Sequence, residues 1–180
     1  MSLLVCMTGT AADRAAAKLQ EENAALLAGH FPERFLEQVR AMKEPAGTEG
    51  FETAEPETEA EDAALPAKQK TAAPAVPIGE GGLWAALWKL GEAAGTGLTV
   101  EASAIPIRQE VVEICEFLGQ DPYSLPSSGA VFLREPQAVL EAREAENGQP
   151  GFTVIGRTTK AAARVVRVGD RVRYLNRSPQ

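Results

Sequence analysis

The first 43 residues carry two kinds of hydrophobic pattern. The apolar run 3–7 predicts a short buried strand. Residues 11–28 are dominated by Ala, Leu, Glu and Lys, which are strong helix formers, and Thr10 or Asp13 is placed to cap the helix that they predict. A second helix, reaching about residue 43, is indicated by apolar residues at i, i+4 and i+7, namely Phe35, Val39 and Met42.

The same alternation of strand and helix patterns returns after residue 78. Helical spacing predicts one helix that starts in the glycine-rich run 79–82, and two further helices over 108–118 and 136–146. Short apolar runs predict strands over 98–101, 130–133, 152–156, 164–168 and 171–175. The order of the predicted elements indicates an α+β domain with a mixed sheet.

The last two predicted strands form a hairpin around the turn Gly169-Asp170. Strict alternation would place one set of side chains on one face and three arginines on the other, that is Val166, Val168, Val172 and Tyr174 against Arg167, Arg171 and Arg173. The favoured interpretation is a solvated outer face of an antiparallel sheet. A phosphate- or nucleic-acid-binding surface is the alternative, and nucleic acid is disfavoured because no exposed aromatic residues interleave with the arginines.

Residues 44–77 differ in kind from both flanking parts. Ala, Glu, Thr and Pro dominate this segment, which cannot bury enough apolar surface to offset its ordering entropy. We predict a disordered acidic linker, with an acidic interaction tail as the alternative. The chain then divides into residues 1–43, the linker 44–77, and a main body over 78–180.

The net charge of −7 reflects that segment rather than the folded part. Between Glu44 and Ala67 there are eight acidic residues and no basic one, and removing them leaves 17 acidic against 18 basic residues. The low isoelectric point therefore says little about the ligands of the folded part. No apolar run approaches the roughly 18 residues of a membrane span, and the start of the chain lacks the basic region of a secretion signal, so we expect a cytoplasmic protein without membrane partners.

Candidate catalytic and metal-binding residues are few. Cys6 and Cys115 belong to no CxxC pair, and His30 is the single histidine of the chain, so the sequence predicts neither a metal site nor a catalytic residue. Cys115 lies on the apolar stripe of a predicted helix, where packing is the expected role.

The glycine-rich run before the first predicted helix of the main body is the strongest candidate for a site. Gly79, Gly81 and Gly82 would present backbone N–H groups at a helix start, where anions are stabilised. The alternative is that these glycines only permit close packing. The run Ser127-Ser128-Gly129 is the second candidate, either as a ligand contact or as a tight strand entry whose hydroxyls satisfy the local backbone.

A longer series of motifs resembles a known family. The glycine-rich helix start is followed in order by IPIRQE, ICEFLGQDPY, SSG and VIGR. Over roughly 78–159 the sequence resembles the C-terminal domain of AIR synthase-related proteins, the group of aminoimidazole ribonucleotide synthetase, selenophosphate synthetase and HypE. The resemblance implies a PurM-like C-terminal fold, with a mixed sheet flanked by helices. It also implies ATP-dependent phosphoryl activation of an amide, carried out together with an N-terminal half that holds Mg-ATP, and a phosphate-binding glycine turn in the C-terminal half.

The sequence departs from the family pattern where chemistry is expected. Relatives commonly carry a His-Asp pair and a Thr or Ser before the glycines, and the matching positions here are Val76, Pro77 and Gly79. The terminal cysteine that a HypE-like role needs is also absent. We therefore interpret the chain as a stand-alone degenerate domain, not active alone, that binds or assembles. The alternative is the C-terminal half of a split enzyme, in which Mg-ATP would bind only with a complementary N-terminal half. The expected partner is a second copy or that half.

Overall fold

The computed structural model describes residues 2–42, 75–145 and 151–175. Within these ranges the strands join in one seven-stranded sheet of order β2-β4-β1-β5-β3-β6-β7. Neighbouring strands are antiparallel except for β3 and β6, which are parallel. The strands are β1 (Leu4–Met7), β2 (Val76–Gly79), β3 (Gly97–Glu101), β4 (Ser127–Arg134), β5 (Thr153–Thr159), β6 (Arg164–Val168) and β7 (Arg171–Tyr174). The sheet is thus mixed, as the sequence predicts.

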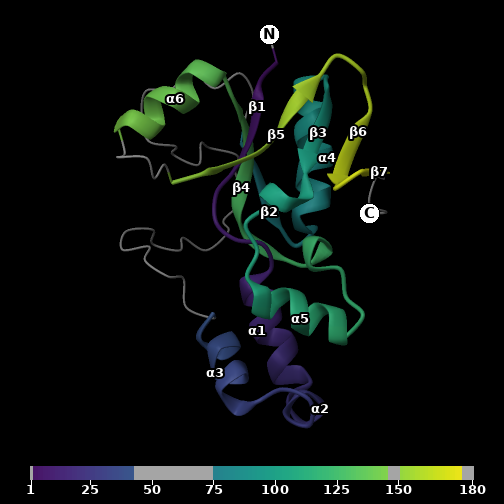
Figure 1. Cartoon of the computed structure of the whole chain (residues 1–180). Helices are drawn as coiled ribbons and strands as arrows, with labels where there is room; N and C mark the ends of the chain where they lie inside the picture. Colours follow the sequence, from purple (N-terminus) through teal and green to yellow (C-terminus); the bar gives the residue numbers. More distant parts are fainter. Residues whose placement is uncertain (1, 43–74, 146–150, 176–180) are drawn as a thin grey trace, which may run out of the picture.

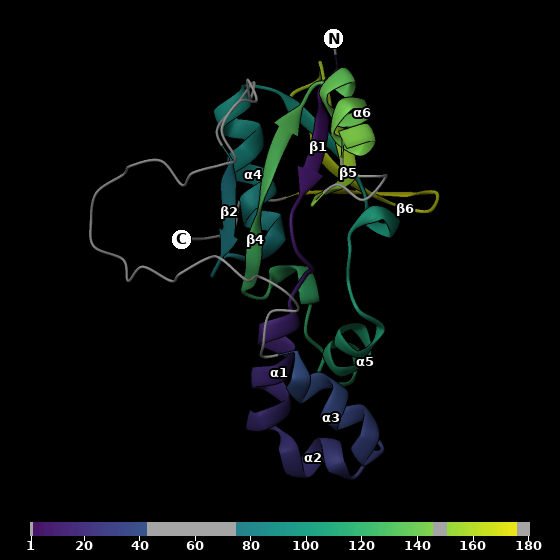
Figure 2. The same ribbon diagram turned by 90° about the vertical axis from the view of Figure 1, so that its left-hand side faces the viewer.

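Helices cover both faces of this sheet and extend beyond one end of it (Figure 1). They are α1 (Asp13–Glu22), α2 (Ala24–Ala28), α3 (Glu33–Ala41), α4 (Gly82–Ala94), α5 (Gln109–Phe117) and α6 (Pro136–Ala145), with short 3₁₀ turns η1 (Ala102–Ala104) and η2 (Pro122–Ser124). Figure 2 shows α4 and α6 on opposite sides of the sheet, and α1, α2, α3 and α5 gathered below it as a helical lobe. The predicted α+β class is confirmed. None of the described helices has the length and apolar character needed to cross a bilayer.

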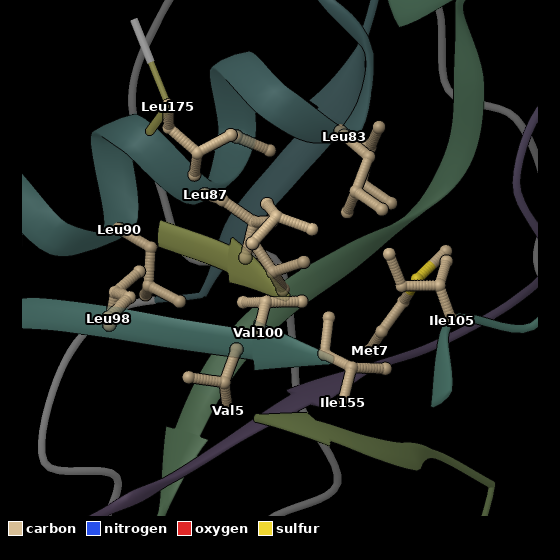
Figure 3. Close-up of a cluster of buried hydrophobic side chains, with 14 of the residues drawn as sticks. Val5, Met7, Leu83, Leu87, Leu90, Leu98, Val100, Ile105, Ile155 and Leu175 are labelled. Carbon is tan, nitrogen blue, oxygen red and sulfur yellow. The ribbon is translucent and has the colours of Figure 1, made fainter. Parts of the chain in front are cut away.

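The main core lies between the sheet and α4 (Figure 3). Alternation along β1 directs Val5 and Met7 into this core. Cys6 faces the opposite side of the sheet, where it packs with Phe132 of β4 and Val139 of α6. The apolar stripe of α4 supplies Leu83, Leu87 and Leu90, all fully buried. The short N-terminal strand is therefore central to the sheet, as its uninterrupted apolar run indicates.

The helical lobe has a core of its own, and Cys115 belongs to it. Its side chain is fully buried beside Val111 and Ile114 from the same helix and Leu36 from α3. The packing role that the sequence predicts for Cys115 is confirmed.

The N-terminal helix differs from its prediction. The run 11–28 forms two helices, α1 and α2, that meet at Asn23. The Asn23 side chain donates a hydrogen bond to the Leu19 carbonyl oxygen at 2.9 Å, and its backbone leaves the helical region, with φ −117°. Local side-chain bonds of this kind compete with the backbone hydrogen bonds of a helix. The run is therefore interrupted at Asn23, although the residues on both sides of Asn23 have high helix propensity.

The cap expected at the start of α1 is also different. Ala12 occupies the N-cap position with a left-handed φ of 59°, and no side chain caps the helix. The Thr10 hydroxyl instead donates to the Asp13 carboxylate at 2.6 Å, and Arg108 approaches the same oxygen at 3.1 Å. The predicted cap is therefore replaced by a side-chain bond between Thr10 and Asp13 and by a long-range contact of Asp13 with Arg108.

Part of the predicted linker belongs to the sheet. Val76 and Pro77 form the first half of β2, which pairs with β4 at the edge of the sheet. An edge strand tolerates a proline because one side of it needs no ladder hydrogen bonds. Residues 44–74 of the predicted linker lie outside the described residues.

The hairpin of β6 and β7 forms at the predicted turn, but its faces are assigned differently. Val168 is opposite Arg171, and Val166 is opposite Arg173. Directly opposed residues share a face, so a two-residue turn puts even-numbered residues of β6 with odd-numbered residues of β7. The predicted separation of valines from arginines is therefore wrong: Val166 and Val168 lie with Arg171 and Arg173, and Arg167 lies with Val172 and Tyr174.

Burial predicts that both thiols are inert in the folded protein. It raises the pKa of Cys6 and of Cys115 from 9.0 to about 11. We expect neither thiol to react with an aromatic disulfide reagent at pH 8 until the protein is unfolded, when both react. Because the unfolded thiols release protons before the folded ones do, stability should fall as pH rises from about 9 toward 11. Rapid labelling of the native protein would contradict the buried placement.

Candidate functional site

A groove of about 420 Å³ lies where three segments meet. One wall is the exposed side of α1, another is the turn between β2 and α4, and the third is the segment that enters β4. Gly79, Ser127 and Ser128, three residues predicted as candidates, line it together with Arg14 and Lys18 of α1. The structure thus brings both predicted candidate segments to one place and adds two cationic side chains.

Hydrogen bonds to the start of β4 fix the chain segment that leads into α1. The Thr8 N–H donates to the Ala130 carbonyl oxygen at 3.0 Å, and the Ala12 N–H donates to the Ser127 hydroxyl oxygen at 2.8 Å. Arg14 and Lys18 follow immediately, one helical turn apart and exposed on the same side of α1. The two cationic side chains therefore reach the groove from a helix whose start is fixed by hydrogen bonds.

The two serines have different roles. Ser127 is buried, and its hydroxyl accepts from Ala12 and donates to the Leu125 carbonyl oxygen at 3.3 Å. That hydroxyl serves the local backbone, which is the strand-entry role considered for this run. Ser128 is exposed at the groove, so its hydroxyl is the one able to meet a ligand.

The glycines divide in the same way. Gly79 borders the groove with φ +55°, and a Cβ placed on it would meet nothing within 4 Å. Gly82 has φ +70°, and a Cβ there would lie 2.6 Å from the Tyr123 carbonyl oxygen. Gly129 has φ +99° and a Cβ there would lie 2.2 Å from the Thr8 carbonyl oxygen, while Gly81 is the N-cap residue of α4. Gly82 and Gly129 are thus required for close packing, and only Gly79 combines an open environment with the groove.

A carboxylate of the protein already lies beside the first turn of α4. The Asp121 carboxylate accepts from Trp84 Nε1 at 2.9 Å, from the Tyr123 N–H at 3.1 Å and from the Ser124 hydroxyl at 3.1 Å. Through Trp84 and η2 it ties the start of α4 to the loop after α5. Sequence reasoning did not predict this arrangement.

Charges in the groove are mixed. Lys18 Nζ lies 3.8 Å from a Glu22 carboxylate oxygen, and Glu80 adds a second carboxylate to the lining. In the part of the chain that the structure describes, no ion pair joins Arg14 to a carboxylate. Arg14 is therefore the cation with most capacity for an added anion, and its planar group suits phosphate oxygens.

The side chains that line the groove include hydroxyl, carboxylate and cationic groups. Neither a histidine nor a cysteine lines it. Across the described ranges, no group of three or more His, Cys, Asp or Glu side chains is arranged to hold a metal ion. Phosphoryl chemistry requires a nucleophile with an adjacent base, or a cluster of carboxylates that holds Mg²⁺.

Sequence reasoning missed Arg14 and Lys18 as candidates. Their i, i+4 spacing is visible in the sequence and places both on one side of a helix. The pairing of β1 with β4, which brings that helix to the serine run more than 110 positions later, is not visible locally.

These features define a domain class: a mixed sheet with a helix on each face, a helical lobe at one end and a groove between them that is lined by both cationic and acidic side chains. A family model described as "AIR synthase related protein, C-terminal domain" matches residues 33–169. The chain belongs to this family, which confirms the resemblance seen in its motifs. Among curated proteins, it is 41% identical over 92 residues to carbamoyl dehydratase HypE of Rhodobacter capsulatus, a match that covers 49% of this chain and 27% of the relative.

Solved structures with the same fold include HypE from E. coli, with a TM-score of 0.61 and 18% identity over 97% of this chain and 49% of that one. Another is a hydrogenase maturation protein HypE in complex with ATP, with a TM-score of 0.63 and 16% identity over 99% of this chain and 51% of that one. The chain spans about half the length of these solved structures.

Proposed function

We propose that this domain acts by binding and assembly without catalysis of its own, and that its groove holds a phosphate-bearing ligand. The observation that carries the proposal is the convergence of Arg14 and Lys18 with Ser128 and Gly79 on one groove of about 420 Å³. Guanidinium, ammonium and hydroxyl donors beside an open glycine are the groups that recognise phosphate oxygens.

The absence of catalysis is proposed from the residues beside the glycine turn. The polar residues common in relatives are replaced here by Val76, Pro77 and Gly79, all in β2. Ser127, which could have served as a nucleophile, is occupied by two backbone bonds. In the groove, a bound phosphate would therefore meet donors and the carboxylates of Glu22 and Glu80, but no histidine and no hydroxyl paired with an adjacent base.

The alternative is that the domain forms one half of an ATP-dependent enzyme whose other half is a separate polypeptide. It is supported by the 41% identity to carbamoyl dehydratase HypE and by the fold shared with a HypE solved in complex with ATP. In that case the partner would be the complementary half rather than a second copy of this chain, and Mg-ATP would bind only in the assembled pair.

The test is thermal unfolding with inorganic phosphate, tripolyphosphate, AMP and Mg-ATP. A ligand at ~100 times its dissociation constant adds about 2.7 kcal/mol, which raises Tm by several degrees. We expect tripolyphosphate to raise Tm and the double variant Arg14→Ala/Lys18→Ala to lower its affinity more than about tenfold, because each lost charge-assisted hydrogen bond costs about 1.5–3 kcal/mol.

A charge-matched control is the double variant Arg34→Ala/Lys160→Ala, which removes two exposed cations outside the groove lining. Equal losses in the two double variants would reduce the effect to net charge and contradict the groove. A response to Mg-ATP that appears only with an added N-terminal-type polypeptide would favour the split enzyme.

A further inference from the structure

The free edge of β7 differs from the opposite edge of the sheet. Among the described strands, β7 pairs only with β6, and β2 at the other end pairs only with β4. Pro77 within β2 removes a backbone donor, a common protection of sheet edges. All four residues of β7 are exposed, and none is a proline. This edge is open to an added strand, and it is independent of the groove described above.

The register shows which backbone groups of β7 point outward. The Leu175 N–H donates to the Arg164 carbonyl oxygen at 2.9 Å, so this opposed pair is a hydrogen-bonded one. Such pairs alternate along an antiparallel ladder, which makes Arg171 and Arg173 bond inward to β6. The N–H and C=O groups of Val172 and Tyr174 therefore face the open edge.

The side chains beside those groups are unusually exposed for their type. Val172 is 54% exposed and Tyr174 is 66% exposed. Both lie on the face of the hairpin away from α4, because Val166, on the other face, is buried in the core under α4. An added strand would therefore meet two apolar side chains on one of its faces.

The other face of the edge is cationic. Arg171 and Arg173 share it, and no ion pair joins either to a carboxylate within the described ranges. A second copy of this chain pairing through β7 would bring the same cations together, and like charges close to one another destabilise strand pairing. A strand that alternates acidic and apolar residues complements both faces at once.

We propose that the free edge of β7 binds an extended segment of a partner protein in which acidic and apolar residues alternate. The segment adds to the sheet as an eighth strand beside β7, through the outward N–H and C=O groups of Val172 and Tyr174. Its apolar side chains pack on Val172 and Tyr174, and its carboxylates contact Arg171 and Arg173.

The test measures fluorescence anisotropy of a labelled short peptide of alternating glutamate and valine, with an alternating lysine and valine peptide as the control. We expect only the glutamate peptide to bind. Val172→Pro removes an outward N–H while leaving the inward bonds of β7, and it should weaken binding about tenfold or more. Val172→Thr keeps that N–H and should bind within a few-fold of wild type.

Charge reversal provides the second arm. Arg171→Glu/Arg173→Glu should abolish binding of the glutamate peptide and create binding of the lysine peptide, with Tm recorded for every variant to show that it folds. Three results would overturn the proposal: a folded wild-type protein that binds neither peptide at millimolar concentration, a dimer dissolved by Val172→Pro in sedimentation, or an oligonucleotide that binds through the arginines and is insensitive to Val172→Pro.

Discussion

Gly82→Val is expected to cost about 3–6 kcal/mol of the free energy of unfolding, enough to unfold a domain of ordinary stability. The φ of +70° at Gly82 is strained for any β-branched residue. A Cβ there would also lie 2.6 Å from backbone atoms of both Tyr123 and Ser124, which cannot move aside as a flexible side chain does. Urea unfolding followed by circular dichroism measures the loss.

Gly82→Ala and Gly79→Ala form the matched pair that tests the reason for this loss. Gly79 has a similar left-handed φ of +55°, but a Cβ there would meet open space. Only the conformational cost applies, so we expect a loss of about 1 kcal/mol. Equal losses at the two positions would show that the contact between α4 and η2 is looser than the structure has it.

This difference decides how the groove is tested. A substitution at Gly82 that abolishes ligand binding would report loss of the fold, because that glycine packs against η2 and does not line the groove. Arg14 and Lys18 line the groove with exposed side chains, and a Cβ at Gly79 would meet open space, so variants at these three positions separate binding from folding.

Asp121→Ala is expected to cost about 3 kcal/mol. It removes the acceptor of the Trp84 indole N–H, the Tyr123 backbone N–H and the Ser124 hydroxyl. The first two donors are partly buried, and each donor left there without a partner costs about 1–3 kcal/mol. Thermal unfolding measures the loss. Glu116→Ala, which removes an exposed carboxylate from α5, is the control and should change stability by less than about 0.5 kcal/mol.

Asp121→Asn gives a second readout at the same position. Burial, and after it the charge of Asp121, raises the pKa of Tyr123 above 10.0. Removing the charge while keeping an acceptor should lower the pKa of Tyr123 part of the way back, because burial remains. Titration of tyrosine absorbance near 295 nm measures the shift. An unchanged titration would mean that Asp121 does not face the phenol.

The elements that the sequence predicts most closely are those with strong local signals. The helix α4 begins in its glycine run and ends at Gly95, which has the left-handed φ of +62° that favours glycine at a helix end. The hairpin turn at Gly169-Asp170 also lies where the dipeptide indicates. The prediction for the faces of that hairpin is wrong because it continues the side-chain alternation through the turn. Pairing across a two-residue turn instead places Val168 and Arg171 on the same face.

The candidate site was predicted only in part. Gly79, Ser127 and Ser128 were singled out from sequence and meet at the groove, but Gly82, Gly129 and Asp121 owe their roles to contacts with chain segments distant from them. Arg14 and Lys18 become candidates only once α1 is seen against the start of β4. Whether these residues bind a ligand stays a prediction.

The α+β class, the family and the main helices and strands follow from the sequence, because hydrophobic period, glycine positions and motif order are local properties of the chain. The order of the strands in the sheet, the glycines needed for packing and the cations that line the groove become visible only in the three-dimensional fold. The pairing of β1 with β4 and β5 joins residues more than a hundred positions apart. No local pattern encodes such a pairing, since it depends on the packing of the whole sheet against α4 and α6.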